Sequence, residues 1–219
     1  MRVVTLNVQF GRRVAEACQL FARHRDLARA DLVLLQEMDR GGTETVAVSL
    51  AMRHVYYPAC VHARTGRDFG NAVLSRWPLG GGEKIELPHR SLHDGSARAA
   101  TVATVDTPAG PVAVASVHLA TRFEMTPWAR RRQLAALLHH LHLRGRDRVV
   151  VGGDFNSHRI GRIAIAEGFG WTTHPLGGRL GRWRAIDHIV VRGLRASAVG
   201  RVLDTRDATD HPAVWADLV

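Results

Sequence analysis

The sequence of 219 residues contains few cysteines and no long apolar segment. Its two cysteines, Cys18 and Cys60, allow at most one disulfide bridge, which argues against a disulfide-stapled secreted domain. No apolar run reaches the roughly 18 residues that a membrane-spanning helix needs, so no membrane span is expected. Met1 is followed at once by a strand-like segment instead of the ordered regions of a secretion signal. We therefore expect a cytoplasmic protein in which Cys18 is a buried free thiol.

Acidic side chains are also scarce relative to basic ones. The chain has 30 Lys+Arg against 20 Asp+Glu, a formal net charge of +10, and almost all of the excess is arginine. Such a positive field attracts polyanions, namely DNA, RNA or an anionic lipid surface. An arginine- and alanine-rich proteome would produce the same balance, so charge alone does not select a partner.

Several catalytic signatures are missing from the sequence. It contains neither a Walker-type glycine-rich phosphate loop nor a zinc-binding His-Glu-x-x-His motif, and no nucleophilic Ser or Cys motif is evident. These absences exclude the best-known nucleotide-hydrolysing and zinc-peptidase motifs.

The length and patterning of the chain indicate one domain. A chain of 219 residues, 46% of them hydrophobic, is long enough to bury a substantial core. No linker, low-complexity tract or repeat divides it, so we expect a single domain over residues 1–219. No obligate protein partner is evident, and we expect a monomer.

The spacing of apolar residues predicts mixed helices and strands. Helices are expected over 13–29, over 43–53 with Thr43 as N-cap, over 126–143 with Pro127 in the first turn, and shortly after Ser157. A hairpin with a five-residue turn is expected between 97–105 and 111–119. Frequent hairpin signals favour a two-sheet sandwich flanked by helices over a singly wound parallel sheet. The other expected strands are 3–8, 31–36, 56–61, 71–75, 146–151, 185–191, 196–203 and 212–218.

The segment 149–157 is the most informative stretch of the chain. Three valines and two glycines are followed by Asp154, Phe155 and Asn156. On an extended strand rim, Asp154 and Asn156 would point the same way, because side chains alternate along a strand. A carboxylate accepts a proton or holds a water, and a carboxamide donates hydrogen bonds to an oxyanion. The pair suits attack on a phosphoryl or carbonyl centre.

Polar residues recur at the ends of the expected strands. Taken singly, each has a structural explanation, because a lone Asn or Asp caps turns and a lone His is often a satisfied structural residue. Their common position at strand ends is harder to explain structurally, and it predicts one functional site. The residues are Asn7, Glu37, Asn71, His118, Asp154, Asn156, Asp187, His188, Asp210 and His211.

This ordered set resembles the endonuclease/exonuclease/phosphatase superfamily, which includes deoxyribonuclease I-like and exonuclease III-like metal-dependent phosphoesterases. The matching segments follow the order of the family and cover nearly the whole chain. They are 5–8, 35–37, 70–76, 116–119, 152–156, 186–189 and 209–212. The resemblance implies an α/β (α+β) fold, specifically a four-layer α/β/β/α sandwich of two mixed sheets with outer helices. It also implies a divalent metal cofactor, Mg²⁺ or Mn²⁺.

The resemblance also implies roles for the metal-binding residues. Glu37 would be the main metal carboxylate, with Asn7 nearby and Asp210 as a further ligand or a water-mediated contact. Oxygen ligands of this kind agree with a hard cation that keeps several waters.

The remaining site residues would act on the water and the phosphate. By the same resemblance, Asp154 would orient or deprotonate the attacking water and Asn156 would donate to the developing phosphorane oxygens. His211 would be held in tautomer and charge by Asp187. His118 would contact the phosphate, and Asn71 would position His118 or a neighbouring side chain.

Arginines and tryptophans are the candidates for substrate contacts. Arg67, Arg98 and Arg122 are each able to grip a phosphate with two hydrogen bonds. The run 130–132 beside Trp128 is either a solvated helix face or a contact to a phosphate backbone. Trp77, Trp171 and Trp183 either stack on bases or belong to the core. His139, His140 and His142 share a helix end and are read as surface residues.

These observations lead to three hypotheses for function. The first is a Mg²⁺- or Mn²⁺-dependent phosphodiesterase that uses in-line attack of an activated water, expected to be a nuclease with DNA or RNA as its substrate. The second is a phosphatase or phosphodiesterase acting on a small-molecule or lipid phosphate. The third, a non-catalytic nucleic-acid-binding member of the fold, is the least favoured. Loss of chemistry would have released at least one of six site residues, and all are present: Glu37, Asp154, Asn156, Asp187, Asp210 and His211.

Overall fold

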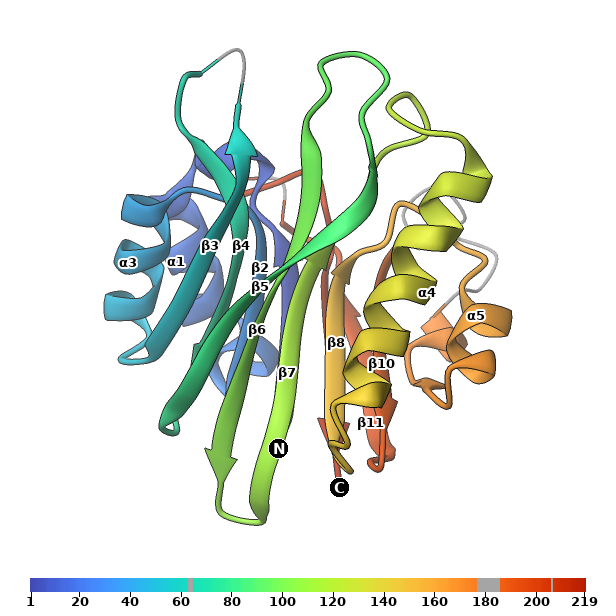
Figure 1. The fold of residues 1–219 in the computed structure, drawn as a ribbon. Helices are drawn as coiled ribbons and strands as arrows, with labels where there is room; N and C mark the ends of the chain where they lie inside the picture. Colours follow the sequence, from blue (N-terminus) through green and yellow to red (C-terminus); the bar gives the residue numbers. More distant parts are fainter. Residues whose placement is uncertain (63–64, 177–185, 206) are drawn as a thin grey trace.

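Two six-stranded β-sheets lie at the centre of the computed structural model, which describes residues 1–62, 65–176, 186–205 and 207–219 (Figure 1). The first sheet has the order β11-β12-β1-β2-β4-β3. Its β1 and β2 are parallel, and its other neighbouring pairs are antiparallel. The strands are β1 Arg2–Asn7, β2 Leu32–Met38, β3 Arg53–Val61, β4 Asp68–Ser75, β11 Ala196–Val202 and β12 Ala213–Leu218.

The second sheet has the order β5-β6-β7-β8-β10-β9. Here β7 and β8 are parallel and the other neighbouring pairs are antiparallel, so both sheets are mixed. The strands are β5 Leu79–Arg90, β6 Ala97–Thr107, β7 Gly110–His118, β8 Val149–Asp154, β9 Gly170–Trp171 and β10 Asp187–Arg192.

Helices cover the outer face of each sheet, as Figure 1 shows. The helices α1 and α3 flank the first sheet, and α4 and α5 flank the second. The predicted four-layer α/β/β/α sandwich of mixed sheets is therefore confirmed. The helices are α1 Val14–Arg23, α2 Arg25–Ala28, α3 Arg40–Ser49, α4 Pro127–Leu143 and α5 Gly161–Ala166, with short 3-10 turns at Gln9–Gly11 and His174–Leu176.

The hydrophobic core is divided into layers. Apolar side chains from both sheets meet in a central cluster that includes Leu34, Val114, Val150 and Ile189. Two further clusters fill the spaces between each sheet and its helices. Gly152 lies at a close approach between the two sheets, because a Cβ atom at this position would meet Leu34 Cδ1 at 2.7 Å. A buried, two-sided sheet of this kind explains the continuous valine-rich runs in the sequence.

The helix boundaries differ from the predictions in two places. The helix expected over 13–29 is interrupted at His24, whose backbone is extended at φ −98° and ψ 113°. The helix expected over 43–53 begins earlier, because Asp39 caps it by accepting a hydrogen bond from the Gly42 N–H. Thr43 is therefore not the N-cap. The Asp39 side chain satisfies an amide that the helix itself leaves unpaired.

Several strand predictions also required correction. The strand expected over 71–75 ends at Ser75 as predicted, but the edge strand β5, which runs through the glycines at 80–82 with two register shifts, was not predicted. In the β6–β7 hairpin, Thr107 pairs with Gly110, so the turn has two residues instead of five. Strand β8 lies three residues later than expected, which places Asp154 within it. The expected start of the next strand at Ala185, and also Trp183, lie outside the described residues.

Cys18 and Cys60 are both free thiols. Each is half-buried, so Cys18 is less buried than predicted, although it packs against the core cluster of the first sheet. Within the described part of the chain, no helix has both the length and the apolar character to cross a membrane.

Candidate active site

The polar strand ends identified in the sequence converge at one edge of the sandwich. In the second sheet, Asp154 is the register partner of both His118 on β7 and Asp187 on β10. In the first sheet, Asn7 ends β1 beside Gln36 on the parallel strand β2. Parallel neighbours end at the same edge of a sheet, which explains why residues distant in sequence become neighbours here.

Glu37 is directed into the site by an irregularity in β2. The register with β4 shifts between Leu35 and Met38, and Glu37 adopts a left-handed backbone at φ 59°. Its carboxylate accepts hydrogen bonds from the Asn7 side chain at 3.0 Å and from the Phe10 N–H at 2.9 Å. Burial raises the pKa of Glu37, and Asn7, His211 and Arg98 partly oppose this effect.

Asn7 is fully buried and links two carboxylates. Its side-chain N–H₂ donates to Glu37 Oε1 at 3.0 Å and to Asp154 Oδ2 at 3.2 Å. Its side-chain oxygen accepts from the Gln9 N–H at 3.0 Å. Because a backbone N–H only donates, this contact fixes the orientation of the amide. Asn7 therefore presents its donor, and not an oxygen ligand, to the carboxylates.

Asp154 occupies the centre of the site. Its Oδ1 accepts from the Asn156 N–H at 2.8 Å, and its Oδ2 lies 3.5 Å from His118 Nε2 and 3.8 Å from His211 Nε2. Burial and the nearby Asp187 carboxylate raise the pKa of Asp154 to about 7, although His211 and the Asn156 N–H oppose this change. A carboxylate with such a pKa is suited to accept a proton near neutral pH.

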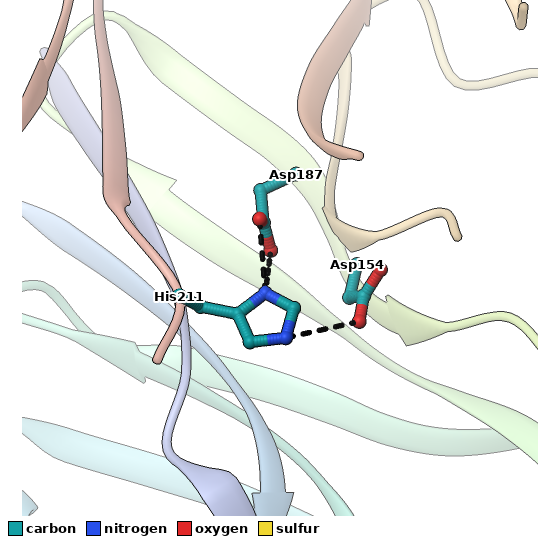
Figure 2. Close-up of side chains that lie close together, drawn as sticks. All are labelled: Asp154, Asp187 and His211. Atoms are coloured by element: carbon teal, nitrogen blue, oxygen red, sulfur yellow. Dashed lines mark hydrogen bonds and ion pairs between the residues drawn. The ribbon is translucent and has the colours of Figure 1, made fainter. Parts of the chain in front are cut away.

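His211 lies between two carboxylates, as Figure 2 shows. Its Nδ1 is 3.0 Å from Asp187 Oδ2, and its Nε2 faces Asp154. Burial alone would lower the pKa of His211, but the charges of Asp187, Asp154 and Asp210 and the hydrogen bond that His211 donates to Asp187 raise it to about 10. The imidazole is therefore a charged donor at neutral pH, with its Nδ1–H directed to Asp187.

His118, unlike His211, is neutral. It is 4% exposed, and burial together with the charges of Arg98 and His211 lowers its pKa well below the ordinary value. Arg98 Nη1 lies 3.2 Å from His118 Nδ1. Since a guanidinium only donates, Nδ1 must accept, and the neutral ring carries its proton on Nε2. That N–H faces Asp154.

Arg98 is engaged within the protein. It is 6% exposed, and its Nη2 donates to both carboxylate oxygens of Glu124 at 2.7 and 2.6 Å. Although burial favours the neutral form of Glu124, Arg98 and the Thr121 N–H hold the pKa of this carboxyl below its ordinary value. These contacts favour a role for Arg98 in positioning His118, and its predicted contact with substrate phosphate stays a prediction.

Asn156 does not alternate with Asp154 along an extended rim, contrary to expectation. Strand β8 ends at Asp154, and Asn156 adopts a left-handed conformation at φ 47°. Its backbone N–H donates to Asp154, and its side-chain N–H₂ donates to the Leu119 carbonyl at 2.9 Å. Asparagine tolerates this backbone conformation better than most residues. The second side-chain N–H remains available to an oxyanion.

The other predicted site residues differ in their burial and in their partners. Asn71 is buried and donates to the Ala99 carbonyl at 2.6 Å, while its side-chain oxygen has no hydrogen-bond partner among the described residues. Asp210 is exposed and acts on His211 through its charge. Arg67 forms an ion pair with Asp39. Arg122 is exposed, with its guanidinium 4.7 Å from the Phe123 ring centroid.

The sequence indicated no individual role for several residues around the site. Glu124, which holds Arg98, lies in a loop without a recognisable motif. Gln36 links the two sheets by donating to Ser116 Oγ at 3.0 Å. Arg130, within the arginine run already noted, donates to the Asn156 carbonyl. Only tertiary contacts identify these partners.

Two tryptophans and two of the clustered histidines have partners other than the catalytic groups. Trp171 is half-buried, and its Nε1 donates to His188 Nδ1 at 3.3 Å. Trp77 packs against the central core. His139 and His142 contact Glu167 at the protein surface, in agreement with their interpretation as surface residues.

The donor set fits a divalent cation. Glu37, Asp154 and Asp187 are gathered in a buried region, and each has a raised pKa because burial disfavours its charged form. A cation would relieve this unfavourable charge, and carboxylate oxygens suit Mg²⁺ and Mn²⁺. Ligand atoms of Asp154, Asp187 and His211 lie within 4.8 Å of one another, a spacing compatible with a metal ion. The charged state of His211 disfavours it as a ligand, and both Asp187 oxygens contact the His211 Nδ1–H, which leaves the Glu37 and Asp154 carboxylates.

Comparisons with known proteins agree with this geometry. A model of the Endonuclease/Exonuclease/phosphatase family matches residues 4–211. A search of curated proteins gives no significant match. The chain is 23% identical to an endonuclease/exonuclease/phosphatase from Beutenbergia cavernae DSM 12333, with a TM-score of 0.75 over 100% of this chain and 71% of that chain.

Two further solved structures share the fold. The human Nocturnin catalytic domain with bound sulfate anion is 20% identical, with a TM-score of 0.75 over 100% of this chain and 94% of that chain. D. rerio TDP2 complexed with a single-strand DNA product is 14% identical, with a TM-score of 0.75 over 100% of this chain and 98% of that chain. Identities this low show a common fold and leave the substrate undetermined.

The family match extends over nearly the whole chain and includes every strand end that contributes to the site. Members of this family are generally hydrolytic phosphoesterases that depend on a divalent metal, and the buried carboxylates described above fit that requirement. The chain belongs to the endonuclease/exonuclease/phosphatase family.

Proposed function

We propose that this protein is a divalent-metal-dependent phosphodiesterase that cleaves nucleic acid by in-line attack of an activated water. The observation that carries the proposal is the environment of Asp154. This carboxylate has a pKa of about 7 and faces a charged histidine, a neutral histidine and a buried amide donor. Such an arrangement combines a base for water with donors for a phosphoryl group.

Asp154 is assigned the role of accepting a proton from the attacking water. Its two oxygens are oriented by the Asn156 N–H and the Asn7 side chain, so the carboxylate is held before substrate arrives. Positioning of this kind lowers the entropy cost of the reaction. The ordinary carboxyl of an exposed aspartate would be a weaker base at neutral pH.

His211 is assigned the role of a charged donor to the phosphate. Its proton on Nδ1 is bound to Asp187, which leaves the Nε2–H free to donate to a phosphoryl oxygen beside Asp154. His118 and Asn156 offer additional N–H groups from the other side of the carboxylate. Together these groups stabilise the negative charge that grows on the phosphoryl oxygens.

Glu37 is the carboxylate that we assign to Mg²⁺ or Mn²⁺, with Asp210 as a further or water-mediated contact. A bound divalent ion would neutralise phosphate charge at this edge of the site. Asn7 supports this assignment indirectly, because its amide holds the Glu37 carboxylate next to Asp154. Asn71 is assigned the role of positioning His118 or a neighbouring side chain.

A nucleic acid is the favoured substrate because of charge. The formal net charge of +10 attracts a polyanion, and the exposed Arg122 lines a pocket that also includes Asn156. The bound sulfate in Nocturnin and the single-strand DNA product of TDP2 belong to proteins with the same fold. They are consistent with a phosphate-bearing polymer.

The proposal is tested by cleavage of supercoiled plasmid and of a single-stranded oligonucleotide with Mg²⁺, Mn²⁺ or EDTA. Bis(p-nitrophenyl) phosphate and p-nitrophenyl phosphate are assayed in parallel. Asp154→Asn serves as the inactive variant, and Asp106→Asn, which changes an exposed carboxylate in the β6–β7 hairpin, is the matched control.

We expect metal-dependent cleavage that is lost in Asp154→Asn and retained in Asp106→Asn. Turnover of a small ester with both nucleic acids intact would instead favour the small-molecule or lipid phosphoesterase. Absence of metal-dependent turnover on every substrate would overturn the assignment of hydrolysis.

A further inference from the structure

A pocket of about 710 Å³ opens beside the catalytic residues and shares Asn156 with them. Its volume falls within the roughly 300–1,000 Å³ that is typical of small-ligand sites. We call it the arginine pocket. Its lining includes Arg122, Arg130, Arg131 and Arg159 together with Phe123 and Phe155.

The arginine pocket has positive charge only. Four arginines line it, and no Asp or Glu is found among the described residues of its lining. Burial and the charges of Arg131 and Arg122 lower the pKa of Arg130. The Arg130 Nε atom is buried and has no hydrogen-bond partner among the described residues. Clustered guanidinium groups without a carboxylate are stabilised by an anion with several oxygens.

The remainder of the lining is largely apolar. Its apolar floor consists of the half-buried Ile163 above the buried Leu119, Leu134, Phe155 and Ile160. Phe123, at the rim, is 68% exposed, and the Arg122 guanidinium lies over its ring. An apolar floor under a cationic rim matches a ligand that has both a flat apolar group and a phosphate.

A continuous chain of contacts joins the pocket to the catalytic carboxylate. Arg130 Nη1 donates to the Asn156 carbonyl, and the Asn156 N–H donates to Asp154 Oδ1 at 2.8 Å. Leu119 directly follows His118 in sequence, and its carbonyl accepts from the Asn156 side chain. A ligand in the pocket therefore lies next to the position where the scissile phosphate must be.

We infer that the arginine pocket binds an unpaired nucleotide adjoining the scissile phosphate, with its base on the apolar floor and its other phosphate against Arg131 and Arg159. This inference rests on the proposed phosphodiesterase function. It specifies that function further, because it makes a single-stranded polynucleotide the preferred substrate.

The shape of the pocket supports a single strand over a duplex. In a duplex, each base is stacked and paired, so its apolar face is not available to a concave protein surface. An unpaired base exposes that face and is able to enter a pocket. A protein that bound only the backbone of a duplex would need the arginines but not the apolar floor.

The inference is tested by binding, in the catalytically inactive Asp154→Asn background. The pocket variant is Arg131→Gln with Arg159→Gln, and the control variant is Arg132→Gln with Arg162→Gln. All four side chains are exposed, the two variants change net charge equally, and only the first pair lines the pocket. The probe is fluorescein-labelled hexathymidylate in Mg²⁺ buffer, measured by fluorescence anisotropy.

We expect the dissociation constant to rise about tenfold or more in the pocket variant and less than about threefold in the control, because only the former loses direct phosphate contacts. A blunt hairpin duplex should compete more weakly than a single strand of equal length. Equal weakening in both variants, or tighter binding of the duplex, would overturn the inference.

A kinetic comparison separates this inference from the proposed function. In proteins that retain Asp154, the pocket variant should lose kcat/KM for the oligonucleotide and keep it for bis(p-nitrophenyl) phosphate, which lacks a neighbouring nucleotide. If the wild type hydrolyses neither substrate, the proposed function fails, and the binding titration still decides the role of the pocket. Loss of binding to phosphatidylserine vesicles in the pocket variant, with oligonucleotide affinity unchanged, would overturn the inference in favour of a lipid headgroup.

Discussion

His211 Nδ1 lies 3.0 Å from Oδ2 and 3.1 Å from Oδ1 of Asp187, and the Asp187 side chain is completely shielded from solvent. Asp187 begins β10, whereas His211 directly precedes Pro212 and β12 in the other sheet. The contact therefore joins the two sheets at the edge where the catalytic groups meet. Because water is excluded from Asp187, the charge on His211 is screened little, and its proton is held firmly.

This pair predicts how stability depends on pH. The pKa of His211 is raised from 6.5 to about 10, so the folded protein binds this proton more tightly than the unfolded chain does. The corresponding stability is fully present below pH 6.5 and is lost as the pH rises through about 10. We expect His211→Asn to be less stable than the wild type at pH 7 by a margin that narrows above pH 10. Urea unfolding in EDTA measures this margin.

The reference for that comparison is His54→Asn, a change at an exposed position on β3. The free energy of unfolding of His54→Asn should differ from that of the wild type by the same small amount at pH 7 and at pH 11. A His211→Asn deficit that stays constant from pH 7 to pH 11 would show that the pair does not hold the proton.

Replacing Asp154 should separate activity from stability. We expect Asp154→Asn to reduce turnover by about a thousandfold or more, because the amide cannot accept the proton of the water. The same change should raise the melting temperature in EDTA, since burial and Asp187 disfavour the charged form of Asp154. Calorimetry and a phosphodiesterase assay test both parts. Retained turnover would remove Asp154 from the role of base.

Metal dependence should identify Glu37. We expect Glu37→Gln to raise the Mn²⁺ concentration for half-maximal activity by about tenfold or more, because a neutral amide binds a hard cation weakly. Titration calorimetry with Mn²⁺ provides a measurement that does not depend on turnover. Glu44→Gln, at an exposed position on α3, should leave both titrations unchanged. If Glu37→Gln also leaves them unchanged, Glu37 is not a metal ligand.

The buried pair of Arg98 and Glu124 should contribute to stability. We expect Arg98→Met to lower the free energy of unfolding by about 3 kcal/mol, because Glu124 is left without its cationic partner. The double variant with Glu124→Gln should recover part of that loss. A double-mutant cycle by urea unfolding measures the coupling. Additive losses would show that the two side chains do not act together.

The strand ends show why much of the site was predictable from sequence. Polar residues such as Glu37, His118 and Asp154 interrupt apolar runs, and such interruptions are visible without a structure. Their conformations were less predictable. Asn156 was expected on an extended rim, but it turns back and bonds to Asp154 and Leu119. A local pattern does not encode contacts that depend on a neighbouring strand.

The edge strand β5 illustrates the same limit for the fold. No strand was expected over 79–90, where three glycines stand at 80–82 and glycine usually weakens a strand. In the structure, a Cβ at Gly82 would meet Val55 Cγ1 at 2.8 Å, so the small residue accommodates a close neighbour. The partner that requires glycine lies on β3, in the other sheet, and is not identifiable from sequence spacing.

The sequence by itself determined the alternation of helices and strands, the order of the polar strand ends, and the family that they resemble, because periodicity and motif order are properties of the linear chain. The tertiary structure decided the charge states. Asn7 meets Asp154 across 147 positions of sequence, and burial beside Asp187 raises the pKa of Asp154 to about 7. Burial and charge proximity exist only after folding, and they make one histidine neutral and the other charged within the same site.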